Sequence, residues 1–258
     1  MPSRLHLPAG AIPSAFDSRD LVFDTAAATL PGHCRLEHRV DVRNQQSLPC
    51  CVSMAITSCL EILDAVDGEV AELSPLFHYY FARANPDDLT PIDPRTALRI
   101  AASVGICLRS LHDVAYDSAG AATPPLREAI EDARSRRLVG YDPGTRATQY
   151  QLLTLPRVHA ARHALAGRNP VLLGLWVTSP YEALHRDAPI HGWPEGETSD
   201  AGHAVVLVGY DDDRSVFLVE DSRGAEFARD GHWEMPYDLF ESRLVYEAWA
   251  LRRITYNT

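Results

Sequence analysis

The chain has 258 residues and a formal net charge of −11, and every one of its 24 basic side chains is arginine. The absence of lysine excludes P-loop NTPases, protein kinases of the usual kind and Schiff-base enzymes, because each depends on a positioned lysine amine. The negative charge opposes non-specific nucleic-acid binding, and no apolar run in the sequence is long enough to span a bilayer. We therefore predict neither a nucleic-acid partner nor a membrane partner.

The N-terminus and the cysteines indicate the compartment. The first 20 residues lack the continuous apolar segment of a secretory signal, and prolines and a glycine interrupt them. The five cysteines are an odd number, thinly spread in a chain long enough to fold without disulfides: Cys34, Cys50, Cys51, Cys59 and Cys107. We predict a cytoplasmic protein and assume no disulfide.

The first half of the chain is mostly helical in pattern. Residues 1–48 are rich in turn formers, which predicts an extended arm with one strand near Phe16 or Val22. Apolar residues then recur at three and four positions, and Ser74-Pro75 is typical of an N-cap followed by the first helical turn. Three helices are expected, over Cys51–Val66, Leu76–Ala84 and Pro94–Val104.

The second half adds two helices and then several strands. The helices are expected over Leu126–Arg137 and Val158–Leu165. Runs of β-branched and apolar residues predict strands over Val171–Val177, His203–Val208, Val216–Val219 and Val245–Ile254, with a turn over Gly209–Asp213. The order indicates an α+β fold, with an N-terminal arm and helical lobe in residues 1–115 and a β-rich lobe in residues 116–258.

Cys51 is the first candidate for chemistry. It lies at the predicted start of a helix, where the macrodipole and unpaired backbone N–H groups favour the reactive thiolate. Gln45, six residues upstream, can donate its amide N–H to an oxyanion that forms beside the cysteine. Taken alone, Cys51 is equally a small buried apolar residue, and Gln45 a residue of a polar loop.

Two residues downstream complete a catalytic pattern. His203 stands at the start of an apolar strand, which can hold an imidazole rigidly, and Asp221 ends the next strand. Each has an ordinary structural reading, as a strand-end histidine and a turn aspartate. Together with Gln45 and Cys51 they form the order of nucleophile, base and orienting acid that an acyl-transfer enzyme needs.

Three motifs in the same order resemble the papain-like cysteine peptidases, specifically their compact bacterial relatives. Asn44–Ser53 is similar to the Asn-Gln-Gly-Ser-x-Gly-Ser-Cys-x-Ala run of that family. His203–Val205 with Val208–Tyr210 matches its His-Ala-Val and Val-Gly-Tyr elements. Asp221–Gly224, followed by Gly231-His232, resembles its Asn-Ser-Trp-Gly and Gly-Tyr elements.

The resemblance implies a papain-like α+β fold, with a helical lobe packed against a β-rich lobe and the active-site cleft between them. It implies that Cys51 is the nucleophile and Gln45 the oxyanion-hole glutamine of a peptidase that forms a thioester acyl-enzyme. The implied partner is a peptide or protein substrate, and no cofactor is expected. The resemblance starts near Phe16, with only fifteen residues before it, so we expect no long pro-segment.

The sequence also departs from the family pattern. Asp221 stands at the orienting asparagine, and Arg223 stands at a tryptophan, from which it can pair with Asp221 and weaken the hold of that residue on His203. Pro49-Cys50 replaces Gly-Ser, and Cys50 is either a redox partner of the nucleophile or a substitute for serine. Two alternatives follow: an amidase, deamidase or acyltransferase/ligase on a dedicated substrate, or an inactive papain-like binding module.

Weaker candidates complete the set. Residues that can line the substrate cleft are Cys50, Trp193, Gly202 and Arg223. Three histidines and an aspartate are of the types that bind metals, but they lack the paired spacing of a metal site: His185, His191, His203 and Asp200. We therefore predict no metal.

Overall fold

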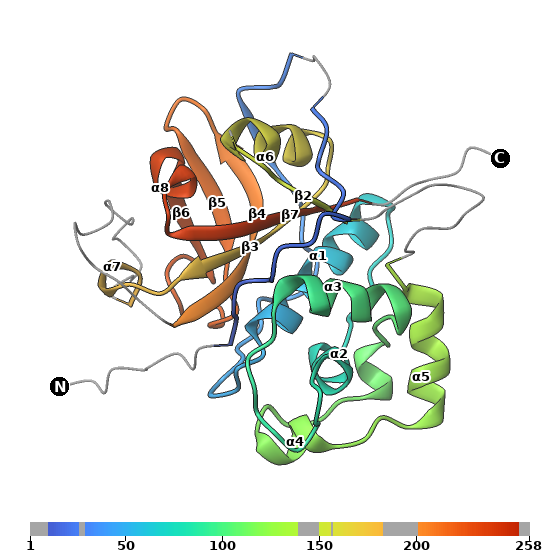
Figure 1. The fold of residues 1–258 in the computed structure, drawn as a ribbon. Helices are drawn as coiled ribbons and strands as arrows, with labels where there is room; N and C mark the ends of the chain where they lie inside the picture. Colours follow the sequence, from blue (N-terminus) through green and yellow to red (C-terminus); the bar gives the residue numbers. More distant parts are fainter. Residues whose placement is uncertain (1–9, 26–28, 139–149, 156, 183–200, 253–258) are drawn as a thin grey trace.

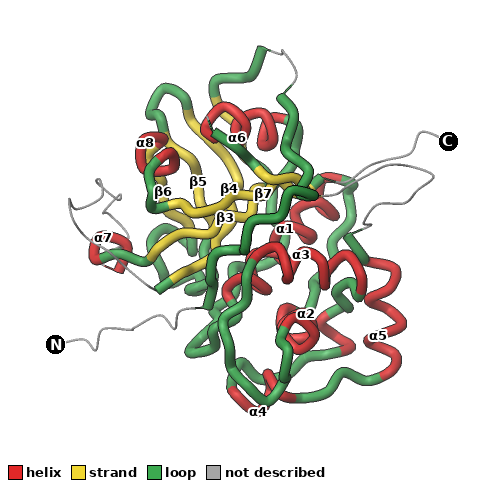
Figure 2. The backbone as a smooth tube through the Cα atoms, viewed as in Figure 1, coloured by secondary structure: helices red, strands yellow, loops and turns green. Residues whose placement is uncertain are grey.

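The protein divides into helices on one side and a sheet on the other (Figures 1 and 2). The computed structural model describes residues 10–25, 29–138, 150–155, 157–182 and 201–252. In Figure 1, α1 lies between the sheet and the remaining helices of the N-terminal half, while α6 and α8 lie on the far side of the sheet. The predicted α+β fold is confirmed.

The helical part begins at the predicted residue. Its main helices are α1 (Cys51–Val66), α2 (Pro75–Ala82), α3 (Pro94–Ser103), α4 (Ser118–Ala122) and α5 (Arg127–Ala133), with 3₁₀ turns over Arg109–Leu111 and Arg134–Arg136. The Ser74 hydroxyl accepts from the backbone N–H of Phe77, so the predicted N-cap is confirmed. Helices α2 and α3 end one or two residues earlier than expected, which is the usual uncertainty of a helix end.

The β-rich part is a single antiparallel sheet. Its strands are β1 (His33–Arg35), β2 (Tyr150–Leu152), β3 (Val171–Trp176), β4 (Gly202–Asp211), β5 (Val216–Glu220), β6 (His232–Pro236) and β7 (Val245–Leu251). The order is β2-β7-β3-β4-β5-β6, with β1 paired to β4. Helices α6 (Arg157–Ala166), α7 (Ser179–Glu182) and α8 (Tyr237–Glu241) accompany it.

The four predicted strands are present, and three further strands were not expected. Strands β1 and β2 have three residues each, and β6 carries a charged residue and ends in proline, so none shows an apolar run. Strand β4 continues to Asp211, so the turn predicted over Gly209–Asp213 was placed three residues too early. The chain turns at residues 212–215 instead.

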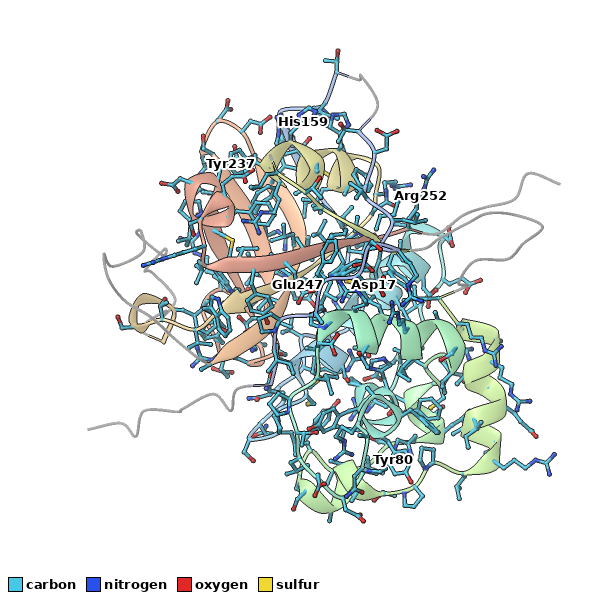
Figure 3. The ribbon with its side chains drawn as sticks, viewed as in Figure 1. Asp17, Tyr80, His159, Tyr237, Glu247 and Arg252 are labelled. Carbon is cyan, nitrogen blue, oxygen red and sulfur yellow. The ribbon has the colours of Figure 1, made fainter. Side chains whose placement is uncertain are left out.

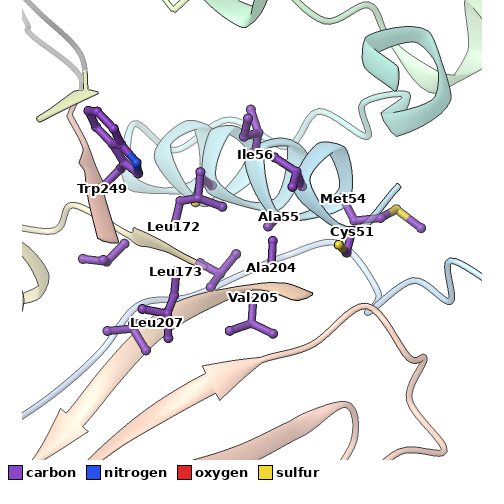
Figure 4. Packing of buried hydrophobic residues seen from close by; sticks show 14 of the residues in the cluster. Cys51, Met54, Ala55, Ile56, Leu172, Leu173, Ala204, Val205, Leu207 and Trp249 are labelled. Carbon is purple, nitrogen blue, oxygen red and sulfur yellow. The ribbon is translucent and has the colours of Figure 1, made fainter. Parts of the chain in front are cut away.

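One core joins the helices to the sheet. Helix α1 is buried along nearly its whole length, and it packs across β3 and β4 (Figure 4). Ile56 of α1, Leu172 of β3 and Leu207 of β4 are each fully buried in this core. This packing fixes the helix that begins with Cys51 against the strand that carries His203.

The N-terminal arm runs extended between the two parts. Ser14 donates its backbone N–H to Glu247 on β7 at 2.9 Å (Glu247 is labelled in Figure 3). Val22 forms an isolated bridge with Leu152, so the strand expected nearby is reduced to a single pair. Phe16 is 93% exposed and lies in no strand.

Candidate active site

Cys51 is the first residue of α1, where its backbone N–H has no partner within the helix. No side chain caps this end, and no acidic residue stands in the first turn. The N-terminus of a 16-residue helix therefore presents its positive end and free N–H groups to the thiol. Figure 4 shows Cys51 at the end of the helix, near Ala204 of β4.

His203 and Asp221 meet on neighbouring strands. His203 is the second residue of β4, and Asp221 directly follows β5, which pairs with β4. The Nε2 of His203 lies 3.1 Å from Oδ1 of Asp221, and both side chains are buried. The structure thus brings together two residues that stand 18 positions apart in the sequence.

The other nitrogen of His203 faces the predicted nucleophile. Nδ1 has no hydrogen-bond partner among the described residues. Burial by itself lowers the pKa of His203, but the charge of Asp221 and the interaction with the Cys51 sulfur outweigh it and raise the pKa to about 10. The surroundings therefore favour the imidazolium form of His203.

Two residues that the sequence did not single out also hold Asp221. The hydroxyl of Tyr181 on α7 donates to Oδ2 at 2.8 Å, and the indole N–H of Trp233 on β6 donates to the same oxygen at 3.0 Å. Burial disfavours the carboxylate, but the charge and hydrogen bond of His203, the hydrogen bond of Tyr181 and the charge of Arg223 hold the pKa of Asp221 below its usual value. Trp233 lies twelve residues after Asp221, on a five-residue strand in which polar and apolar residues alternate and which was not predicted.

Gln45 is fully buried, and both the oxygen and the nitrogen of its side-chain amide form hydrogen bonds. Its Oε1 accepts from the hydroxyl of Ser222, which follows Asp221, at 2.5 Å. Its Nε2 donates to the carbonyl of Leu48 at 2.8 Å, which leaves the second amide proton free to donate elsewhere. Ser222 was seen only as part of a motif, and the structure assigns it the task of orienting Gln45.

Arg223 does not act on Asp221 as expected. Its guanidinium lies 4.1 Å from the ring centre of Phe227 and 5.7 Å from that of Tyr181. Among the described residues Arg223 forms no ion pair with Asp221, so the predicted competition with His203 is wrong. The guanidinium lies over aromatic rings instead, and its charge still helps to lower the pKa of Asp221.

Cys50 directly precedes Cys51, the predicted nucleophile. Cys50 is fully buried, and this burial raises the pKa of its thiol well above the ordinary value. Both Cys50 and Cys51 are free thiols. A protonated buried thiol favours the serine-substitute interpretation over the redox partner.

The arm forms hydrogen bonds with both walls beside Cys51. The backbone N–H groups of Gly10 and Ala11 donate to the carbonyl of Gly202 at 3.1 and 3.2 Å. On the helical side Ile12 donates to Ile92 at 3.3 Å, and Ile92 donates back to Gly10 at 3.3 Å. Gly202, a predicted cleft residue, thus lies where an extended chain can bind.

This arm passes directly over the thiol. A Cβ atom on Gly10 would lie 2.7 Å from the Sγ of Cys51 and 2.9 Å from the carbonyl carbon of Pro49. A Cβ on Gly202 would collide with the carbonyl oxygen of Ala11. Two glycines therefore permit the close approach, and Cys51 is fully buried as a result.

A network of buried charged side chains lies beside Asp221. His38 contacts Glu220 through Nδ1 at 2.7 Å and Glu61 of α1 through Nε2 at 3.0 Å. Arg43 forms an ion pair with Glu61, and Glu220 immediately precedes Asp221. Burial lowers the pKa of His38, but the two carboxylates outweigh it and raise the pKa to about 9. The network joins the Cys51 helix to the Asp221 strand.

Some predicted residues cannot be placed. Trp193, His185, His191 and Asp200 lie outside the described residues. Within the described part of the chain no group of three His, Cys, Asp or Glu side chains is arranged to hold a metal ion. In the same residues no helix is both long and apolar enough to cross a membrane.

The comparisons with known proteins identify the fold. No protein-family model matches the chain. An uncharacterised peptidase C1-like protein of Acanthamoeba polyphaga mimivirus is 25% identical over 189 residues, which cover 70% of this chain and 59% of that relative. The chain thus spans less than two thirds of the length of this relative.

The solved structures that it resembles are cysteine proteases. Xylellain from Xylella fastidiosa matches with a TM-score of 0.84 at 21% identity, covering 96% of this chain and 97% of that one. A digestive procathepsin L 3 of Tenebrio molitor matches with a TM-score of 0.71 at 16% identity, covering 91% and 74%. A Carica candamarcensis protease solved with E-64 matches with a TM-score of 0.64 at 18% identity, covering 87% and 100%. The chain therefore has the papain-like cysteine protease fold, as its three motifs predicted.

Proposed function

We propose that the protein is a cysteine peptidase in which Cys51, His203 and Asp221 form the catalytic triad. The observation that carries the proposal is the position of His203, with Asp221 at 3.1 Å on one nitrogen and the other nitrogen left for the Cys51 thiol. The raised pKa of His203 favours an imidazolium beside a thiolate. A buried structural histidine would instead have both nitrogens satisfied by ordinary partners.

The geometry supports the following reaction. The Cys51 sulfur attacks the scissile carbonyl carbon and forms the C–S bond, while the carbonyl oxygen becomes an oxyanion. The backbone N–H of Cys51 and the free amide proton of Gln45 stabilise that oxyanion. His203 gives its Nδ1 proton to the leaving amine as the C–N bond breaks, which leaves a thioester.

The second half of the reaction reverses these roles. A water molecule gives a proton to Nδ1 of His203 and attacks the thioester carbon. The C–S bond then breaks and releases the carboxylic acid, and the proton on His203 again faces the thiolate. Asp221 holds Nε2 throughout and so keeps the imidazole in one orientation.

The arm supports a peptide as the substrate class. Residues 10–12 bind as an extended strand, with backbone hydrogen bonds to Gly202 on one wall and Ile92 on the other. Any extended peptide can form the same bonds, because they involve only main-chain atoms. An amidase, deamidase or ligase that acts on a dedicated substrate would use the same acyl-enzyme, and the products distinguish them.

One labelling experiment tests the proposal. The variant that lacks residues 1–12, and so lacks the segment that lies over the Cys51 thiol, is treated with E-64 or iodoacetamide at pH 6.5, and the modified cysteines are mapped by mass spectrometry. We expect Cys51 to react before Cys34, although Cys34 is the more exposed in the full chain, and this preference to disappear when His203→Ala is added. Labelling of Cys34 in preference to Cys51 contradicts the enzyme and favours the binding module. Cleavage of labelled casein by the same variant then separates a peptidase from the acyl-transfer alternatives.

A further inference from the structure

The orienting carboxylate has an unusual set of partners. Oδ1 of Asp221 contacts His203, while Oδ2 accepts two hydrogen bonds, from Tyr181 at 2.8 Å and Trp233 at 3.0 Å. The side chain of Asp221 is completely buried, and Trp233 is 4% exposed. Water is therefore excluded from these contacts, and each donor needs an acceptor at Oδ2.

We infer that Trp233 is a positioning residue that makes a carboxylate obligatory at residue 221, so that asparagine cannot orient His203 in this chain. The inference rests on the proposed triad and concerns how that triad is built. The indole N–H is a donor only, whereas a hydroxyl can turn to accept. Trp233 therefore discriminates between Asp and Asn, and Tyr181 does not.

The donors and acceptors of an asparagine at residue 221 would not match its neighbours. An asparagine offers one acceptor oxygen and one donor NH₂ group. If its oxygen faces His203, the NH₂ group faces the indole N–H of Trp233 across a distance of 3.0 Å in the present geometry. Two donors then point at each other in a buried site, and neither can be satisfied.

The opposite amide orientation fails at His203. With the amide oxygen toward Trp233 and Tyr181, the NH₂ group would lie against Nε2 of His203 at about the present 3.1 Å. Nε2 must then lose its proton to become an acceptor, and the neutral imidazole that results carries its only proton on Nδ1. The imidazolium that the Cys51 thiolate needs is lost in this arrangement.

Trp233 and Tyr181 thus stabilise the negative charge of Asp221. Their two donors stabilise the anionic form of Asp221, and the anion in turn stabilises the imidazolium of His203. The rings of Tyr181 and Trp233 lie 5.7 Å apart in an edge-to-face contact, and the ring of Tyr181 lies 5.6 Å from that of His203. The aromatic cluster therefore fixes the direction of both donors.

The test is a comparison of four full-length proteins: wild type, Asp221→Asn, Trp233→Phe and the double variant. The measured quantity is the rate of Cys51 alkylation by iodoacetamide at pH 6, with the adduct mapped by mass spectrometry. We expect Asp221→Asn to lower the rate by about 10-fold to 100-fold, which corresponds to one unsatisfied buried group. Trp233→Phe lowers the rate of the wild type slightly but raises the rate of Asp221→Asn by about 10-fold.

The decisive readout is the direction in which Trp233→Phe changes the alkylation rate, because we expect a decrease in the wild type and an increase in Asp221→Asn. A tryptophan that only fills space would, when replaced, lower the rate in both backgrounds. A fall in both backgrounds, or a wild-type rate in Asp221→Asn, overturns the inference while leaving the peptidase proposal intact. Absence of preferential Cys51 alkylation in the variant without residues 1–12 instead contradicts the proposed function itself.

A second measurement serves if Trp233→Phe does not fold. The assigned indole N–H resonance of Trp233 is compared between the wild type and Asp221→Asn. We expect a downfield shift and slow solvent exchange in the wild type, both reduced in the variant, because only the carboxylate accepts that proton. Identical shifts and exchange rates overturn the inference.

Discussion

Removal of the arm from the cleft should expose the nucleophile. The proposed perturbation is deletion of residues 1–12, which includes Gly10, Ala11 and Ile12. The remaining arm stays attached, because Ser14 bonds to Glu247 at 2.9 Å. A deletion of residues 1–7 is the matched control, since it shortens the same terminus but retains the residues over Cys51.

The structure gives the size of the effect. Residues 10–12 form four backbone hydrogen bonds with the two walls, two at Gly202 and two at Ile92. At about 1 kcal/mol each, these bonds hold the arm in place by about 4 kcal/mol. An energy of that size leaves Cys51 uncovered in about one molecule in a thousand, so its loss raises the reaction rate by up to about 1000-fold.

The assay is the second-order rate of Cys51 alkylation by iodoacetamide at pH 7, followed by mass spectrometry. We expect a large increase for the deletion of residues 1–12 and no change for the control. Thermal unfolding of each protein verifies that the fold is retained. Equal rates in wild type and deletion would refute the claim that the arm covers the thiol.

Three further predictions follow from the site. His38 has a folded pKa of about 9, above its ordinary 6.5, so its contribution to stability is complete below pH 6.5 and is lost as the pH rises through 9. That contribution is about 3 kcal/mol. The free energy of unfolding in urea should therefore fall between pH 6 and 10 in the wild type, and His38→Gln should remove this fall. An equal fall in His38→Gln rejects the assignment to His38. Ser222→Ala frees the amide of Gln45 to rotate, and we expect kcat on a peptide substrate to fall about 10-fold with KM nearly constant; a change in KM alone would mean that Gln45 binds substrate instead. Cys50→Ser should leave the alkylation rate of Cys51 within about 2-fold of the wild type, and a large loss would give Cys50 a part in the chemistry.

The sequence was sufficient for the main elements and for bringing together Cys51, His203 and Asp221 as candidates. Helix α1 has strong apolar periodicity, strands β3, β4, β5 and β7 are apolar runs, and Cys51 stands at the predicted helix start. Their packing in one core brings Cys51, His203 and Asp221 close, as the order of the motifs indicated. Periodicity is the signal that sequence carries best, because it reflects burial of one face.

The partners of Asp221 were not predictable in the same way. Tyr181 lies on the four-residue helix α7, and Trp233 lies on a short strand that lacks an apolar run. Their contact depends on where α7 and β6 pack, which no local pattern encodes. The expected ion pair of Arg223 with Asp221 failed for the same reason, since Phe227 holds the guanidinium elsewhere.

The course of the N-terminal arm also required the structure. Gly10 appeared in the sequence only as one of several turn formers. Its absent Cβ allows the chain to pass over Cys51, a contact between residues 41 positions apart that no spacing rule suggests. The covering of Cys51 by the arm was therefore not predictable from the sequence.

The pH dependence of Cys51 alkylation tests the central claim most directly. The measurement uses the variant without residues 1–12, with and without His203→Ala, between pH 4 and 10. If Cys51 and His203 form a thiolate–imidazolium pair, the rate stays high down to about pH 5, and His203→Ala makes it rise only near the pKa of an ordinary thiol, about 8.5. Identical curves for the two proteins, both rising near pH 8.5, would contradict the account.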